Sequence, residues 1–164
     1  MAYNPSDLRP GDVILVAIHP WQDILADLIT FATASPYTHA VLVGDGHLIE
    51  SVAHVTRSPL SKYTHTGDAF SVLATGDQKQ AAIEVAEARV GTPYGTSELL
   101  DDAARYFLHL PAVYPWNARR QTCSGFVAYA FRKSGVPLSF APDPSPADLS
   151  YSPLLVGSRP WVHK

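Results

Sequence analysis

Apolar and polar residues follow two periods along the chain, and the shorter period predicts strands in its first half. A β-branched apolar run after Pro10-Gly11 predicts a buried strand over about residues 12–18. Two apolar runs flank Asp45-Gly46, and an Asp-Gly pair between such runs favours a two-residue turn, so a β-hairpin is expected here. Residues 69–75 predict another strand.

The longer period predicts helices between and after these strands. Apolar residues at helical spacing indicate helices over about residues 21–35, 76–91, 97–110 and 123–134. Asp77 lies near the start of the helix predicted over 76–91, and Gly91 ends that helix. Gly135 follows the end of the helix predicted over 123–134. The proline-rich residues from about 137 predict an irregular tail laid over the surface. No internal repeat or long linker divides residues 1–164, so a single domain is expected.

Composition narrows the classes of function. The chain is 46% hydrophobic with a formal net charge of -3, which is ordinary for a globular protein. The densest basic cluster is Arg119-Arg120, so we expect no nucleic-acid partner. No secretory signal pattern and no apolar run of roughly 18 residues occurs, so we expect no transmembrane segment and a chain that is cytoplasmic as synthesised, or virion-associated if it comes from a phage. We expect no cofactor.

The single cysteine, Cys123, lies in "RRQTCSGFVAYAFRKSG", at the start of the last predicted helix. One thiol excludes internal disulfides and thiolate-rich zinc sites. If the helix begins at Thr122 or Cys123, its unsatisfied N–H groups and its dipole favour an anion, which lowers the thiol pKa and makes a nucleophile. The alternative is a buried small residue that packs with Val127 and Phe131.

A base for this thiol can be sought in the hairpin. With Asp45-Gly46 as a two-residue turn, Val41 lies opposite Glu50, so His39 and Glu50 share one face as diagonal neighbours about 7–8 Å apart along the backbone. In an acid–base unit, Glu50 would fix the imidazole tautomer and His39 would accept the thiol proton.

Other interpretations of the same residues stay open. Glu50 could be a rim carboxylate paired with Arg57, and His39 a core histidine satisfied by a backbone carbonyl. His39, His47, Glu50 and His54 are close enough in sequence to suggest a metal site, but the inferred register puts His47 on the opposite face from His39 and Glu50, so we expect none.

Four segments in order resemble a known family. "GDVILV", "ITFATASPYTHAVLVGDGHLIES", "GTPYG" and "TCSGFVAYAFRKSG" resemble the circularly permuted branch of the NlpC/P60 papain-like superfamily, in particular the YiiX/YaeF-like proteins, over most of residues 11–135. In unpermuted members the cysteine precedes the histidine, whereas here His39 precedes Cys123. The hairpin is also similar to that of lecithin retinol acyltransferase relatives, in which a second histidine stands near the position of Glu50.

The resemblance implies a fold and a set of site residues. The fold is α+β and permuted papain-like, with a small antiparallel sheet packed against helices and the nucleophile at a helix N-terminus. Cys123 is implied as nucleophile, His39 as base and Glu50 as the orienting group. Thr38, Ser124 and Tyr94 are candidate substrate-binding residues.

The chain also departs from the family pattern at two positions. YiiX-like members more often carry Cys-Ser-Glu-Leu-Val where this chain has Cys-Ser-Gly-Phe-Val, which is closer to unpermuted enzymes. Tyr94 is followed by Gly95 rather than by the acidic residue of relatives, so it either assists the oxyanion or is a packed aromatic.

The resemblance implies a cysteine hydrolase that cleaves an acyl bond. An amide in peptidoglycan stem peptides is the first candidate substrate, and a lipid ester or N-acyl amide is the alternative. A different class is also open, because a structural subunit of a larger assembly, such as a phage tail, would suit the proline-rich tail and the missing export signal. A tail subunit could itself digest cell wall.

Overall fold

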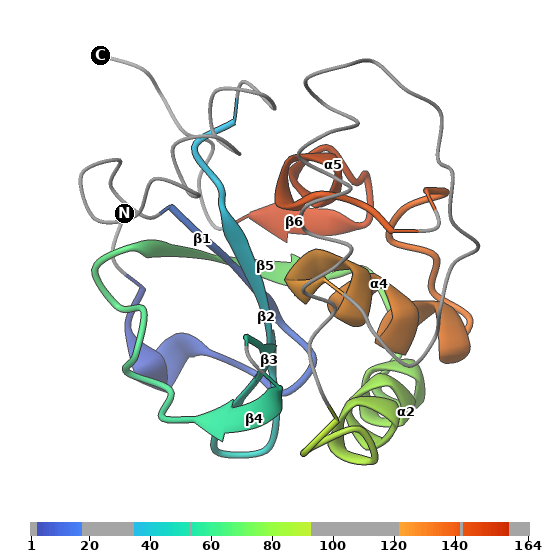
Figure 1. Ribbon diagram of the computed structural model, residues 1–164, viewed down its shortest axis with the longest axis horizontal. Coiled ribbons are helices and arrows are strands. Elements are labelled where there is room, and N and C mark those ends of the chain that lie inside the picture. The colour runs from blue at the N-terminus through green and yellow to red at the C-terminus, as the bar shows by residue number, and fades with distance from the viewer. Residues whose placement is uncertain (1–2, 18–34, 53, 93–121, 142, 158–164) are drawn as a thin grey trace.

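The computed structural model describes residues 3–17, 35–52, 54–92, 122–141 and 143–157. These form an α+β fold around a six-stranded sheet in which every neighbouring pair is antiparallel (Figure 1). In spatial order β4-β3-β2-β1-β5-β6, the strands are Val55–Ser58, Leu48–Ser51, His39–Val43, Val13–Val16, Gly67–Val72 and Leu155–Gly157. The helices are the 3-10 turn η1 (Pro5–Asp7), α2 (Gly76–Glu87), α4 (Cys123–Lys133) and α5 (Pro146–Ser150).

The two faces of the sheet have different covers. Helices α2, α4 and α5 lie on one face, where Phe126 and Phe131 of α4 pack against Leu42 and Ile49 in the main core (Figure 1). Burying each of these large side chains contributes about 1.5–3 kcal/mol. On the other face Val41 and Leu48 form a smaller cluster. There they are covered by apolar residues of the N-terminal segment and of the β4–β5 connection: Tyr3, Leu8, Leu60 and Tyr63.

The hairpin prediction is confirmed, including its register. Leu42 pairs with Ile49 and Val43 with Leu48, and the backbone N–H of Gly44 donates to the carbonyl of His47. Gly46 has a φ of +78°, the left-handed conformation that the turn requires and that glycine adopts without strain. This register sends side chains 39, 41, 48 and 50 to the smaller-cluster face.

Helix α2 begins at Gly76, the start that the sequence predicted. Thr75 is the N-cap, and it forms a reciprocal capping box with Gln78. Asp77 lies in the first turn, where its charge complements the helix dipole. The helix ends at Glu87, and Gly91, with a φ of +91°, turns the chain back toward β4.

The C-terminal segment corrects a prediction. The sequence indicated an irregular surface tail from about residue 137, but this segment contains α5 and the edge strand β6, and Leu149 is fully buried in the main core. Ser145 caps α5 with Asp148 in a second capping box, which starts the helix directly at Pro146. Strand β4 was also absent from the sequence-based prediction.

Of the remaining predicted strands and helices, some are confirmed and others lie outside the described residues. The strands predicted over 12–18 and 69–75 correspond to β1 and β5, and the helix over 123–134 corresponds to α4. The predicted helix over 97–110, and the one over 21–35 except for its last residue, fall outside the described residues. Within the ranges the structure describes, no helix has both the length and the apolar character to cross a bilayer.

Candidate active site

The thiol of Cys123 lies at the first residue of α4, as the sequence predicted. Thr122 is the N-cap, and its hydroxyl accepts from the backbone N–H of Gly125 at 3.1 Å while donating to Asp143 Oδ1 at 2.6 Å. The capping bond fixes the start of the helix, and the Asp143 contact ties it to the C-terminal segment. The N-terminal amides of the helix therefore surround the cysteine.

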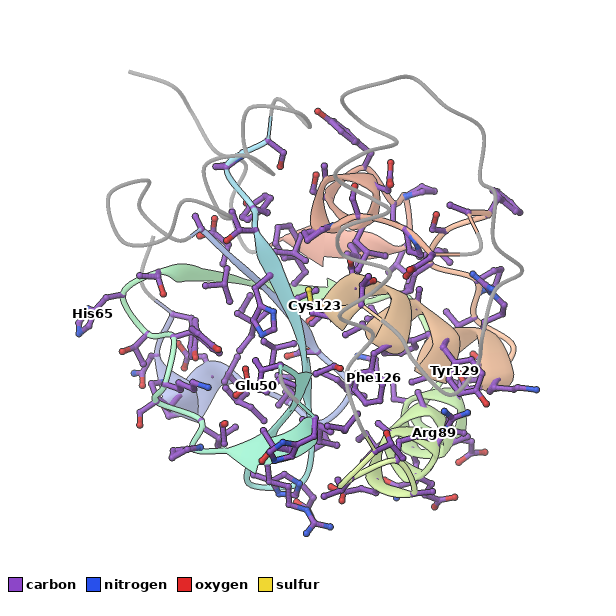
Figure 2. The ribbon with its side chains drawn as sticks, viewed as in Figure 1. Glu50, His65, Arg89, Cys123, Phe126 and Tyr129 are labelled. Atoms are coloured by element: carbon purple, nitrogen blue, oxygen red, sulfur yellow. The ribbon has the colours of Figure 1, made fainter. Side chains whose placement is uncertain are left out.

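Two backbone amides and one imidazole act on the sulfur. Burial alone raises the pKa of the Cys123 thiol, but the neighbouring His39 charge, a hydrogen bond with His39 and N–H donors from Ala40 and Ser124 together lower it. Figure 2 shows the Cys123 sulfur at the end of α4 that faces β2. The arrangement favours a thiolate, which is the reactive form of cysteine.

His39 lies between the thiol and a carboxylate. Its Nε2 is 3.0 Å from Oε2 of Glu50, which leaves Nδ1 as the ring nitrogen available to the thiol. Burial lowers the pKa of His39, but the charge of and hydrogen bond to Cys123, with those of Glu50, outweigh it and raise the pKa to about 9. Cys123 and His39 therefore favour a thiolate–imidazolium ion pair at neutral pH.

Glu50 is fully buried and its carboxylate accepts from four side chains. Lys62 Nζ lies 2.6 Å from Oε1, the Tyr63 hydroxyl lies 2.6 Å from Oε2, and the Ser58 hydroxyl donates to Oε1. Burial opposes ionisation, yet the bonds from His39, Lys62, Ser58 and Tyr63 hold the pKa of Glu50 far below its usual range. The site contains a carboxylate that stays charged at neutral pH.

The thiol bonds the imidazole beside the part of β2 that precedes its printed pairing with β3. In the pairing of β2 with β3, Leu42 lies opposite Ile49 and Val43 lies opposite Leu48. Ala40 lies two residues before this stretch, and its N–H donates to the Cys123 sulfur. Because α4 packs against both strands, its first residue lies where the hairpin presents His39.

Arg57 and His47, the other candidate partners of Glu50 and His39, both contact Glu87 instead. Arg57 donates to Glu87 of α2 rather than to Glu50. His47 also contacts Glu87, at 2.5 Å, and lies on the opposite face from His39, as the register predicted. The described part of the chain contains no group of three or more histidine, cysteine or acidic side chains that could hold a metal ion.

The predicted substrate-binding residues have different positions. Ser124 is almost fully buried, and its backbone N–H points to the sulfur. Thr38 precedes β2, and its hydroxyl donates to the carbonyl of Val16 at 3.4 Å. Tyr94 lies outside the described residues. A substrate-binding role for these three residues stays a prediction.

The roles of Ser58, Lys62 and Tyr63 are not predicted from the sequence. Ser58 ends β4, and the other two lie in the turn that joins β4 to β5. A weak signal existed, since a glutamate flanked by apolar residues needs buried donors, and the lysine and tyrosine closest after it in sequence supply them.

Comparison with solved structures supports the fold. The crystal structure of the metalloprotein YiiX from Escherichia coli O157:H7, of family DUF1105, matches with a TM-score of 0.71 and 19% sequence identity, over 92% of this chain and 96% of that chain. No protein-family model and no curated protein matches this sequence. The chain therefore has a YiiX-like fold, and at this identity the likeness extends to the fold alone.

Proposed function

We propose that this protein is a cysteine hydrolase that attacks an acyl bond with Cys123, using His39 as acid–base and Glu50 as the orienting group. The observation that carries the proposal is the position of the His39 ring, which bonds a buried carboxylate through Nε2 and the only thiol of the chain through the other nitrogen. Nucleophile, base and orienting group in one chain of hydrogen bonds are the parts that nucleophilic catalysis requires.

The first half of the proposed reaction forms an acyl-enzyme. The Cys123 thiolate attacks the substrate carbonyl carbon, and the carbonyl oxygen becomes an oxyanion. The backbone N–H of Cys123 lies at the helix start, where an amide has no intrahelical acceptor, and stabilises this oxyanion. The His39 imidazolium then protonates the leaving amine or alcohol as the bond to carbon breaks.

The second half returns the enzyme to its starting state. Neutral His39 takes a proton from a water molecule, whose oxygen attacks the thioester carbon. The carbon–sulfur bond breaks, the carboxylic acid leaves, and the thiolate–imidazolium pair forms again. Glu50 stays ionised throughout and holds the ring in one orientation.

For the substrate we propose an amide of a peptidoglycan stem peptide, by resemblance to the NlpC/P60 superfamily and its permuted branch. The partner is then the cell wall, reached by a cell-wall-associated or phage-tail protein. A lipid ester or N-acyl amide is the second candidate. It is supported by Phe140, which is 98% exposed and lies three residues before Asp143, the partner of the Thr122 cap.

A metal centre does not fit these residues. The structural neighbour is described as a metalloprotein. In this chain both Glu50 oxygens already accept from protein donors, and one donor is the Lys62 ammonium, which repels a cation. We therefore derive no step through a metal.

Trapping of the acyl-enzyme tests the proposal. Purified protein is incubated with p-nitrophenyl acetate, with peptidoglycan stem-peptide fragments and with lipid esters, and acylation is located by mass spectrometry after acid quench. We expect acyl mass on Cys123 with at least one class of substrate, and none in Cys123→Ala. Hydrolysis at equal rates in wild type and Cys123→Ala would refute the mechanism. A folded protein with an inert thiol would favour a structural subunit.

A further inference from the structure

Two consecutive residues of the β4–β5 connection, Lys62 and Tyr63, converge on the carboxylate of Glu50. Lys62 Nζ donates to Oε1 at 2.6 Å, and the Tyr63 hydroxyl donates to Oε2 at 2.6 Å. Oε2 is also the oxygen that accepts from Nε2 of His39. Tyr63 therefore shares an acceptor atom with the imidazole, and Lys62 neutralises the other half of the same carboxylate.

The aromatic ring of Tyr63 also packs against the imidazole. The ring centroids of His39 and Tyr63 are 5.8 Å apart with a tilt of 58°. The Lys62 ammonium lies 5.1 Å from the Tyr63 ring centroid, within the range of a cation–π contact. The connection therefore limits the orientation of His39 both through Glu50 and by direct ring contact.

This connection is fastened at both ends. The carbonyl of Tyr63 accepts from the backbone N–H of Gly67 at 2.8 Å, at the start of β5. The hydroxyl of Tyr3, in the N-terminal segment, donates to the carbonyl of Leu60 at 2.8 Å. A fastened turn loses little further entropy when it presents its side chains to the carboxylate.

We propose that Lys62 and Tyr63 are positioning residues of the active site, which hold Glu50 with Oε2 directed at His39 and set the pH range in which the pair works. The inference rests on the proposed function and deepens it. Lys62 and Tyr63 act through Glu50 and do not touch the reacting atoms.

The charges around Glu50 predict the direction in which removal of Lys62 moves the pKa values of His39 and Cys123. Glu50 faces side chains from four segments: His39 on β2, Lys62 and Tyr63 on the connection, the neutral Ser58 on β4, and Tyr3 on the N-terminal segment. Cys123 on α4 lies beyond His39. Removing the Lys62 cation leaves Glu50 less neutralised, which favours the His39 imidazolium. It also removes a positive charge that favours the thiolate. The pKa values of both His39 and Cys123 therefore rise.

The first test measures iodoacetamide alkylation of Cys123 against pH. In Lys62→Met we expect the acid limb of the profile to move to higher pH by about half a unit to one unit. Lys62→Arg keeps the cation and should restore the wild-type limb. Lys133→Met makes the same charge change on the last turn of α4, beside Tyr129, and should leave the limb unmoved. Equal shifts in Lys62→Met and Lys133→Met would overturn the role of Lys62.

The second test separates the Tyr63 hydroxyl from its ring. Tyr63→Phe keeps the packing against His39 and removes only the donor to Oε2. We expect kcat for p-nitrophenyl acetate to fall about 10-fold with little change in KM. The matched control is Tyr3→Phe, which removes a hydroxyl that holds the same connection but donates to the carbonyl of Leu60 rather than to Glu50. If Tyr3→Phe lowers kcat as much as Tyr63→Phe does, the hydroxyl of Tyr63 has no positioning role.

Failure of this inference is distinguishable from failure of the proposed function. If wild-type Cys123 alkylates like an ordinary thiol and His39→Ala changes nothing, the proposed function itself is wrong. If wild type is activated and loses activation in His39→Ala, but Lys62→Met and Tyr63→Phe superimpose on wild type, only the roles of Lys62 and Tyr63 are wrong.

Discussion

At the scale of single residues, Cys123 and His39 have pKa values that move in opposite directions. The thiol pKa falls because an imidazolium and two amides favour the sulfur anion, and the imidazole pKa rises to about 9 because a thiolate and a carboxylate favour its cation. Both shifts favour the charged pair, a Cys123 thiolate beside a His39 imidazolium. Under the proposed function, the nucleophile is therefore formed before substrate binds, and His39 already holds the proton that a leaving group needs.

Substitutions of His39 and Glu50 should lower the acylation rate by different amounts. His39→Ala removes the acid–base group, and we expect a fall of about 10²–10⁴-fold. Glu50→Gln keeps the shape and one hydrogen bond to the imidazole but removes the charge, so we expect a smaller fall, of about 10-fold to 10²-fold. Stopped-flow acylation by p-nitrophenyl acetate measures both. A larger loss in Glu50→Gln than in His39→Ala would contradict the assigned roles.

Gly125 has a steric role that the cysteine motif does not reveal. A Cβ at this position would collide with Oδ1 of Asp143, the oxygen that accepts from the Thr122 cap. The missing side chain at Gly125 therefore makes room for a carboxylate from the C-terminal segment.

Gly125→Ala should destabilise the fold by about 1–3 kcal/mol, because well-packed atoms have to shift. Urea unfolding measures the free energy. In the Gly125→Ala/Asp143→Ala double variant the collision is gone, so the cost should be smaller than the sum of the two single variants. Strict additivity would show that the two side chains do not interfere.

At the scale of elements, the parts that the sequence predicted well are those whose signals are local. The Asp45-Gly46 turn specifies its own register, and the alternation of the strands then places His39 and Glu50 on one face. The start of α4 follows from Thr122 as cap and from the apolar spacing after Cys123.

The missed elements depend on contacts with distant parts of the chain. Strand β4 buries only Val55, and β6 has three residues, so neither carries enough alternation to be recognised. The connection that holds Lys62 and Tyr63 is fastened by Tyr3, 57 residues before Leu60, and no local pattern encodes that bond. The arrangement of Cys123, His39 and Glu50 could be predicted from the sequence, whereas the donors to the Glu50 carboxylate could not.

The C-terminal segment should behave as part of the core. Leu149→Ala on α5 removes a fully buried side chain, so we expect a loss of about 2–5 kcal/mol in unfolding free energy. Tyr151→Ala, two residues later, removes a side chain that is 77% exposed and should cost within about 0.5 kcal/mol. Chemical denaturation measures both variants. Equal small effects would restore the surface-tail interpretation.

At the scale of the whole molecule, the site is built from residues that approach from both faces of the sheet. The hairpin and the β4–β5 connection supply His39, Glu50 and its donors on one face, and α4 approaches from the other face with Cys123. The C-terminal segment fixes the start of α4 through Asp143. Segments as far apart in sequence as those of His39 and Asp143 therefore have to fold together before the pair forms.

Because Glu50 is buried and ionised, the free energy of unfolding should decrease at acid pH. The pKa of Glu50 is depressed in the folded state, so its contribution to stability is complete above the unfolded value of about 4.3 and is lost as pH falls through the folded value. Wild type should lose unfolding free energy steeply below about pH 5. Glu50→Gln should be less stable at neutral pH but lose less on acidification. Denaturant titrations at several pH values measure both, and parallel curves would contradict a buried, ionised Glu50.

The most direct test of the central claim is a titration of the thiolate absorbance of Cys123, taken as the difference between wild type and Cys123→Ser. The chain has one cysteine, so the difference reports that residue alone. We expect a thiolate well below the ordinary pKa of about 8.5, and a return toward that value or above it in His39→Ala. An ordinary or raised pKa in wild type, unchanged in His39→Ala, would mean that the two residues form no activated pair and that the protein is not a cysteine hydrolase.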